Sequence, residues 1–192
     1  MEDKPTRIVL VTRNEQIHTL IDPDAAAFLA QLDQAAQADT RIHYLCIQSR
    51  ADENTMQLRH DVGYTLTLLL ANGQLILQEQ IVAAGRQPVS SEIPITSLLE
   101  QILTPDAIIV LNGCRTGKGG DNLARNLSLL LPGRTVCGCA GGVMARAPLF
   151  RQAVRRRKFY RNAQLVLDRT LFGRISHRHP EINRHAARSS GE

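Results

Sequence analysis

The residue with the clearest chemical potential in this sequence is Cys114, which stands where a short apolar run opens into a glycine-rich turn. The run Ile108 to Leu111 is apolar without alternation, which is typical of a strand covered on both faces. The polar residues that follow should emerge at its carboxyl end, where open α/β sheets collect ligands and catalytic groups. Cys114 is therefore our candidate nucleophile. Gly113 and Gly117 are the small neighbours that let other atoms approach the backbone.

The segment after this turn predicts a helix and then a second buried strand. Asp121 stands where a helix cap is expected. Leucines recur behind it at helical spacing until Pro132 and Gly133 end the pattern. The strand Thr135 to Cys139 follows, so the order predicts two parallel neighbouring strands joined by a helix.

The apolar strand, the Gly-Cys-x-Thr-Gly turn, the helix beginning Leu-Ala-Arg and the glycine-containing strand together resemble the CHAT family of caspase-like (clan CD) cysteine peptidases. The matching positions are Leu111, Asn112, Gly113, Cys114, Thr116, Gly117, Gly119, Leu123, Ala124, Arg125, Val136 and Gly138. The stretch LLLANGQLIL at 68–77 also resembles a hairpin of that family, with Asn72 and Gly73 as its turn. The resemblance runs from about Arg41 to Val143. It implies a caspase-like fold and cysteine-dependent peptide hydrolysis.

A cysteine nucleophile also needs a base, because a free thiol has a pKa of about 8.5 and must lose its proton to attack. The resemblance implies a His-Gly pair at the end of the preceding parallel strand, but residues 43–48 read HYLCIQ. His60, in a polar segment before Gly63, is our first choice for the base. His43 is expected to lie within a strand and His18 at the surface.

Peptide hydrolysis further needs backbone amides that hold the negative charge on the carbonyl oxygen. We expect the amide of Cys114 and that of a neighbouring glycine, Gly113 or Gly117, to supply them. The alternative is an ordinary strand-to-helix turn without catalytic function, in which the cysteine is buried and has a structural role.

Other chemistries fit the turn poorly. A phosphate-binding P-loop requires Ser or Thr after its lysine, whereas Gly119 follows Lys118. A phosphatase-like loop requires arginine six positions after the cysteine, and position 120 is glycine. Cys137 and Cys139 lack a second pair of metal ligands at zinc spacing. We therefore expect no metal and no cofactor.

The composition is that of a globular protein without a membrane span. Apolar residues make up 43% of the chain, which suits a buried core. No apolar run approaches the roughly 20 residues that cross a bilayer, and the N-terminal MEDKPTR lacks the apolar region of a signal peptide. The four cysteines lack disulfide-scaffold spacing, which favours a cytoplasmic location with reduced thiols. Signal-independent secretion stays open.

Charge divides the chain into two parts. Residues 1–145 hold 11 basic and 15 acidic residues, and residues 146–192 hold 12 and 3. We therefore expect a caspase-like α/β domain over 1–145 and a basic helical extension over 146–192. Within the extension, Pro148 to Arg161 is predicted as a helix that exposes Arg155, Arg156 and Lys158. Such a face would attract an acidic protein, RNA or an anionic membrane, unless it is merely a solvated helix face.

The remaining pattern alternates strands and helices. It predicts a three-layer α/β fold with a mostly parallel central sheet, a β-hairpin insertion and a basic C-terminal helical segment. The expected elements are a parallel strand at Ile8 to Thr12, a helix from Asp22 to Ala36, a strand at Arg41 to Gln48, a hairpin of Leu66 to Leu70 with Gln74 to Val82, a loop through Pro88 and Pro94, and a helix at Thr96 to Leu103.

Three functions remain at this point. The first is hydrolysis of a peptide or protein substrate at Cys114. The second is a catalytically inactive caspase-like module that binds another protein. The third is binding of an anionic partner through the basic segment.

Overall fold

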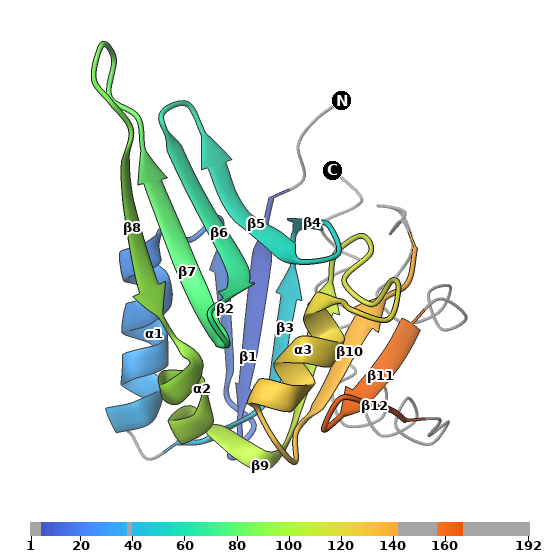
Figure 1. Cartoon of the computed structure of the whole chain (residues 1–192). Helices are drawn as coiled ribbons and strands as arrows, with labels where there is room; N and C mark the ends of the chain where they lie inside the picture. Colours follow the sequence, from blue (N-terminus) through green and yellow to red (C-terminus); the bar gives the residue numbers. More distant parts are fainter. Residues whose placement is uncertain (1–4, 38–39, 142–156, 167–192) are drawn as a thin grey trace, which may run out of the picture.

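The structure is a computed structural model that describes residues 5–37, 40–141 and 157–166. It contains a seven-stranded sheet, a five-stranded sheet and three helices (Figure 1). The α/β class predicted from the sequence is therefore confirmed. No described helix is both long and apolar enough to cross a bilayer.

The seven-stranded sheet has the order β12-β11-β10-β9-β3-β1-β2. Its strands are β1 (Arg7–Thr12), β2 (Ile17–Ile21), β3 (Ile42–Gln48), β9 (Leu103–Asn112), β10 (Thr135–Cys139), β11 (Arg157–Arg161) and β12 (Gln164–Leu165). Strands β3, β9 and β10 are parallel, and every other neighbouring pair is antiparallel. The sheet is thus mixed, and the prediction of a mostly parallel sheet is wrong.

Strand β1 is antiparallel to β3, not parallel as predicted for Ile8 to Thr12, and β2 is the cause. The short turn after β1 lets the chain fold straight back as β2, which can only pair antiparallel. This extra reversal means that the chain enters the next helix from the opposite end of the sheet. Strand β2 was not predicted, and its residues Ile17, Thr19 and Ile21 are exposed.

The five-stranded sheet has the order β4-β5-β6-β7-β8 and is antiparallel throughout. Its strands are β4 (Arg50–Ala51), β5 (Thr55–Asp61), β6 (Tyr64–Ala71), β7 (Gln74–Ile81) and β8 (Val89–Pro94). The predicted hairpin is confirmed as β6 and β7. Asn72 and Gly73 form its turn with φ of 52° and 70°, as a tight hairpin requires.

Two segments that were not predicted as strands, the polar segment before Gly63 and the expected loop through Pro88 and Pro94, contribute strands to this second sheet. Strand β5 buries Met56 and Leu58 while neighbouring residues stay polar and partly exposed. Strand β8 lies at the edge of the sheet, where Pro94 is tolerated because no ladder hydrogen bond is required from its nitrogen. The prediction of a loop through Pro88 and Pro94 is therefore wrong over β8.

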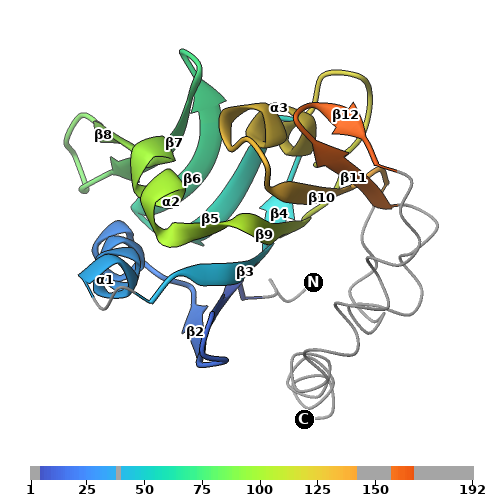
Figure 2. The same ribbon diagram turned by 90° about the horizontal axis from the view of Figure 1, so that it is seen from below.

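The helices α1 (Ala25–Gln37), α2 (Thr96–Ile102) and α3 (Leu123–Leu130) confirm the three helices predicted before residue 145. They and the second sheet share one apolar core with a face of the seven-stranded sheet (Figure 2). This core contains Phe28 and Leu32 from α1, Leu99 from α2 and Leu127 from α3.

The opposite face of the seven-stranded sheet carries a separate apolar cluster. It consists of Val11, Tyr44, Cys46, Val110, Cys137 and Phe159, all buried. Cys46 is thus a core residue.

The parallel strands are joined by two crossovers over the same face. Helix α3 connects β9 to β10, whereas the second sheet and α2 together connect β3 to β9. Both steps advance in the same direction across the sheet, as the common handedness of such connections requires. The second sheet therefore occupies the place of a crossover helix, and the carboxyl ends of β3 and β9 meet at one edge (Figure 1).

The predicted helix from Pro148 to Arg161 is wrong over its described part, since Arg157 to Arg161 form β11. Strand β11 pairs with β10 and buries Phe159 and Tyr160. Lys158 lies half-buried on this strand. Arg155 and Arg156 lie outside the described residues, so the anionic-partner role of the three residues stays a prediction.

Candidate functional site

Cys114 lies just beyond the carboxyl end of β9 and is half-buried. Strand β9 runs between β3 and β10, with Asn112 beside Gln48 and Leu111 beside Gly138. This confirms that Cys114 follows a central parallel strand with Thr135–Cys139 as its parallel neighbour. It is the position at which α/β sheets present reactive groups.

The residue after the cysteine has an unusual backbone. Arg115 has a φ of +63°, in the left-handed region that non-glycine residues seldom adopt. Such a conformation costs roughly 1–2 kcal/mol and persists only where the surroundings impose it. The turn therefore holds Arg115, directly after Cys114, in a conformation that the chain would not choose locally.

Thr116 makes several of the hydrogen bonds that hold this turn. Its hydroxyl is fully buried and lies 3.0 Å from the Leu111 carbonyl oxygen and 3.2 Å from that of Gly113, to one of which it donates. The same hydroxyl accepts the Cys139 amide at 3.0 Å, and the Thr116 carbonyl accepts the Ala124 amide at 3.0 Å. One residue thus ties together the end of β9 and the end of β10 through its side chain, and the start of α3 through its backbone.

Gly117 serves the turn and does not provide an oxyanion donor. Its amide donates to the Cys139 carbonyl at 2.9 Å, so the predicted use of this amide by a substrate conflicts with the geometry. A Cβ atom at Gly117 would lie 2.8 Å from the backbone of Gly138. The two glycines are needed because their backbones are in direct contact.

Gly113 permits an equally close approach on the other side of the turn. A Cβ atom there would lie 2.4 Å from Cβ of Ala51 and 3.2 Å from Cε of Met56. The turn is therefore packed directly against β4 and β5 of the second sheet.

A buried polar pair closes the turn from the C-terminal side. Asn122 donates its side-chain amide to the Gly119 carbonyl at 3.2 Å and to the Tyr160 hydroxyl at 3.1 Å. Its side-chain oxygen accepts the Arg125 amide, which makes Asn122 the cap of α3. The prediction of Asp121 as the cap is wrong by one residue. The Asp121 carboxylate instead accepts a hydrogen bond from the side-chain amide of Asn126.

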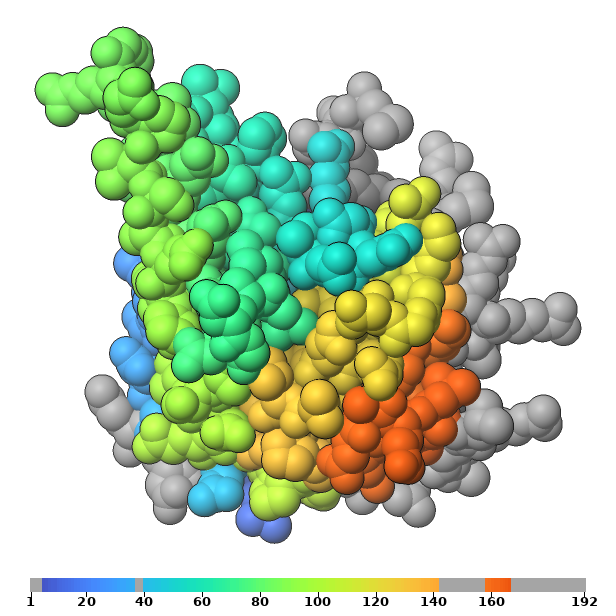
Figure 3. Space-filling view, in the orientation of Figure 1, coloured from blue at the N-terminus to red at the C-terminus, as the bar shows by residue number. Residues whose placement is uncertain are grey.

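The connection between β4 and β5 lies against the turn (Figure 3) and carries Asp52 and Glu53. Glu53 accepts the Leu123 amide through its carbonyl at 2.7 Å and forms an ion pair with Lys118 at 3.5 Å. Partial burial acts to raise the pKa of Asp52, but amide hydrogen bonds from Asn54 and Thr55, the Thr55 hydroxyl and the charge of Arg115 together lower it. Opposite charges therefore face each other across this contact.

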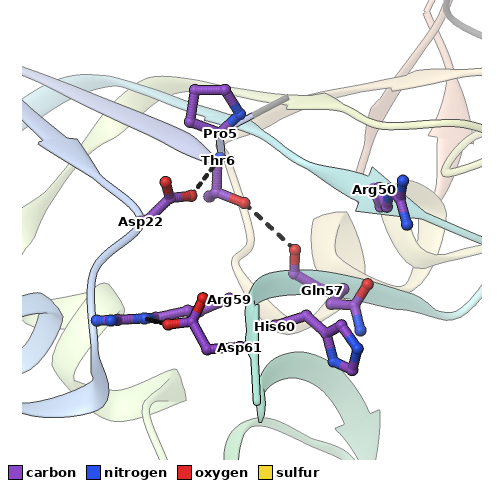
Figure 4. Close-up of a pocket in the computed structure, with 8 residues that line it drawn as sticks. All are labelled: Pro5, Thr6, Asp22, Arg50, Gln57, Arg59, His60 and Asp61. Atoms are coloured by element: carbon purple, nitrogen blue, oxygen red, sulfur yellow. Dashed lines mark hydrogen bonds and ion pairs between the residues drawn. The ribbon is translucent and has the colours of Figure 1, made fainter. Parts of the chain in front are cut away.

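His60 lies elsewhere, on β5 rather than in a loop, and its ring is exposed. Its Nδ1 is 3.3 Å from Oγ1 of Thr65. The ring lines a hollow of about 180 Å³ formed by Pro5, Thr6, Asp22, Arg50, Gln57, Arg59, His60 and Asp61 (Figure 4). Cys114 is not among these lining residues. His60 stands five residues beyond Thr55, or about 16 Å along the strand, whereas the turn contacts the other end of β5.

The two other histidines in the described chain fit the base role less well. His43 is half-buried near the start of β3, whereas Cys114 adjoins the end of that strand. His18 is half-buried on the edge strand β2, not on the open surface. The structure therefore brings Cys114, Gly113 and Gly117 together and leaves His60 in a separate hollow.

The hydrogen-bonding roles of three residues that build the turn, namely Thr116, Asn122 and Tyr160, were not predicted. A threonine inside a glycine-rich turn is a usable signal, because its short hydroxyl side chain can bond to nearby backbone. Tyr160 gave no such signal, because it is far from the turn in sequence and reaches it only through the pairing of β11 with β10.

Within the described residues, no three potential metal ligands cluster. No family model matches the chain, and no curated protein or solved structure matches it either.

Proposed function

We propose that this protein hydrolyses peptide bonds with Cys114 as nucleophile, in a caspase-like arrangement. The observation that carries the proposal is the setting of Cys114: half-buried, at the end of a central parallel strand, and followed by the left-handed Arg115. A thiol held in one orientation can meet a substrate carbonyl without first losing conformational freedom.

The reaction has two halves. The Cys114 sulfur attacks the scissile carbonyl carbon, and its proton passes to an imidazole, by preference that of His60. The imidazolium then protonates the leaving amine as the C–N bond breaks, which leaves a thioester. Water, deprotonated by the same imidazole, cleaves the thioester and restores the thiol. The amides of Cys114 and Gly113 are the proposed donors to the oxyanion, because that of Gly117 is engaged.

The proposal requires His60 to approach Cys114 when substrate binds. Strand β4 lies between the two: Ala51 packs against Gly113, and Arg50 lines the hollow of His60. We expect substrate binding to bring the two residues together, since catalytic hydrogen bonds tighten in the substrate complex.

The deciding measurement is the pH dependence of Cys114 alkylation. Selectivity among the thiols is uninformative, because Cys46, Cys137 and Cys139 are buried whatever the function. An activated thiol alkylates with a midpoint below about 8.5. His60→Ala should raise that midpoint, and the matched control His18→Ala should leave it unchanged. Hydrolysis of a mixed peptide pool should disappear in Cys114→Ala.

The second candidate is a module that binds a protein without cleaving it. It is favoured by the bond of His60 to Thr65 and by the engaged amide of Gly117. Under this alternative the alkylation midpoint stays near the ordinary thiol value in every variant, and the peptide pool is not cleaved.

A further inference from the structure

The outer edge of the second sheet is formed by strand β8. Strand β8 pairs with β7 on one side, and no strand of the described chain pairs with its other side. Residues Val89 to Glu92 are all exposed. The end of the sheet formed by β7 and β8 also projects beyond the rest of the described chain (Figures 1 and 3).

The pairing of β7 with β8 fixes which backbone groups face outward. The Ile95 amide donates to the Leu75 carbonyl at 2.9 Å, and the register continues with Leu77 opposite Ile93 and Glu79 opposite Ser91. Hydrogen-bonded pairs alternate along an antiparallel ladder. Ser90 and Glu92 therefore turn their N–H and C=O groups away from β7.

The prolines at both ends follow the same alternation. Pro88 and Pro94 occupy the next outward positions on either side, and neither has an N–H to donate. Each chain thus offers two outward donors, those of Ser90 and Glu92, bracketed by positions that offer none.

We propose that β8 pairs antiparallel with β8 of a second copy of this chain. In the register that sets Ser90 opposite the partner's Glu92, all outward donors of both copies find carbonyls. The same register sets Ser91 opposite the partner's Ser91 and Pro88 opposite the partner's Pro94. The register uses every outward donor, and a shift by one residue would set outward groups against inward ones and leave those donors unmatched.

Side chains agree with this register. Glu92 meets the partner's Ser90, so the two carboxylates are not placed opposite each other. Val89, which is 67% exposed, meets the partner's Ile93, whose side chain packs against the core of its own chain.

The projecting end supplies further apolar surface. Val62, Ile81 and Val82 are 107%, 47% and 44% exposed, and the Val82 amide bonds to the Gly63 carbonyl at 2.8 Å. In an antiparallel pair, the projecting end of one copy lies alongside the body of the other. A short strand pair alone buries less than the roughly 1,200–2,000 Å² of a standard interface, so we expect weak, concentration-dependent dimers.

The first test removes an outward donor. Ser90→Pro deletes the N–H that faces the partner and spares the ladder to β7, which proline tolerates at an edge. The matched control is Thr19→Pro on the edge strand β2, where the Thr12 amide to Gln16 carbonyl bond sets the N–H of Thr19 outward in the same way. In sedimentation equilibrium of the full chain, Ser90→Pro should weaken self-association at least tenfold and Thr19→Pro should not change it. A chain that stays monomeric at millimolar concentration, or responds to Thr19→Pro instead, overturns the proposal.

The second test reads the register directly, in a Cys114→Ser background. Opposed residues of a non-hydrogen-bonded pair have Cα atoms about 4.5 Å apart, within reach of a disulfide. Ser91→Cys should therefore form disulfide-linked dimers on mild oxidation. Ser90→Cys, which faces the partner's Glu92, should form them at least tenfold more slowly. Equal rates for the two variants, or no crosslinking of Ser91→Cys, contradict the proposed pairing.

Discussion

The Cys114 turn and the His60 hollow flank the same short strand, β4, yet they are held in different ways. The turn is fixed by buried and partly buried hydrogen bonds between backbone groups and the side chains of Thr116 and Asn122. The hollow is lined by partly exposed side chains, including the Arg59–Asp61 ion pair at 2.6 Å. Buried bonds contribute to stability, whereas exposed pairs contribute little. Substitutions in the turn should therefore lower the free energy of unfolding, and those in the hollow should leave it nearly unchanged.

The largest loss of stability is expected from Gly138→Ala. The added Cβ would lie 2.6 Å from Cβ of Ala124 and 2.8 Å from the Gly117 nitrogen, and neither can move freely. We expect the free energy of unfolding to fall by about 3 kcal/mol, measured by urea denaturation. Gly120→Ala is the matched control, because nothing lies within 4 Å of its Cβ. Equal losses in the two variants would mean that the turn is not closely packed.

A smaller loss of stability should follow Thr116→Val, which keeps the volume of the side chain but removes its hydroxyl. The buried Cys139 amide then lacks the acceptor that it has at 3.0 Å. The expected loss is about 2 kcal/mol in the free energy of unfolding, read from thermal denaturation. Thr116→Ser, which retains the hydroxyl, should recover most of it. If serine and valine are equally destabilising, the methyl group and not the hydroxyl holds the turn.

Asp52→Asn tests the charge at the border between the two regions. The pKa of Asp52 is lowered in the folded state from its ordinary 3.8, so its ionised form favours folding. This contribution is present above the unfolded pKa and is lost as the pH falls through the folded pKa. Because the residue is exposed, we expect less than about 1 kcal/mol at pH 7. The difference in urea midpoint between parent and variant should shrink near pH 3, and a constant difference would refute the assignment.

The smallest effect on stability is expected in the hollow. His60→Ala removes an exposed ring and a 3.3 Å contact with Thr65, so the free energy of unfolding should change by less than about 0.5 kcal/mol. The same variant is the one expected to shift the alkylation of Cys114. A loss above about 1 kcal/mol would show that His60 has a structural role, and the comparison between the regions would fail.

The sequence predicted the parts of this fold that local patterns specify. The unbroken run Ile108 to Leu111 indicated the central strand, and Asn72-Gly73 between two apolar stretches indicated a hairpin. Those same signals located Cys114 at the end of its strand. Each depends on neighbours within a few residues, which is why sequence alone sufficed.

The errors fall on strands at or near the sheet edges. Strands β2, β8 and β11 each pair with a strand on a sheet edge or lie at one, and they carry exposed or mixed residues that a periodic pattern does not mark. Their direction depends on long-range partners, as when β2 reverses the chain and makes β1 antiparallel to β3. Tyr160 could not be linked to the turn for the same reason. Whether His60 serves Cys114 stays a prediction.

The second sheet, standing where a crossover helix would be expected, also affects the order in which the chain can fold. Strands β5 to β8 follow one another through successive antiparallel pairings, so they depend on short-range contacts that form quickly. The pairing of β3 with β9 must enclose residues 49–102 and is entropically costly until that sheet has formed. The Cys114 turn needs β10 as well, and its bond to Tyr160 needs β11. A chain emerging from the ribosome would therefore carry a folded hairpin sheet well before its thiol site takes shape.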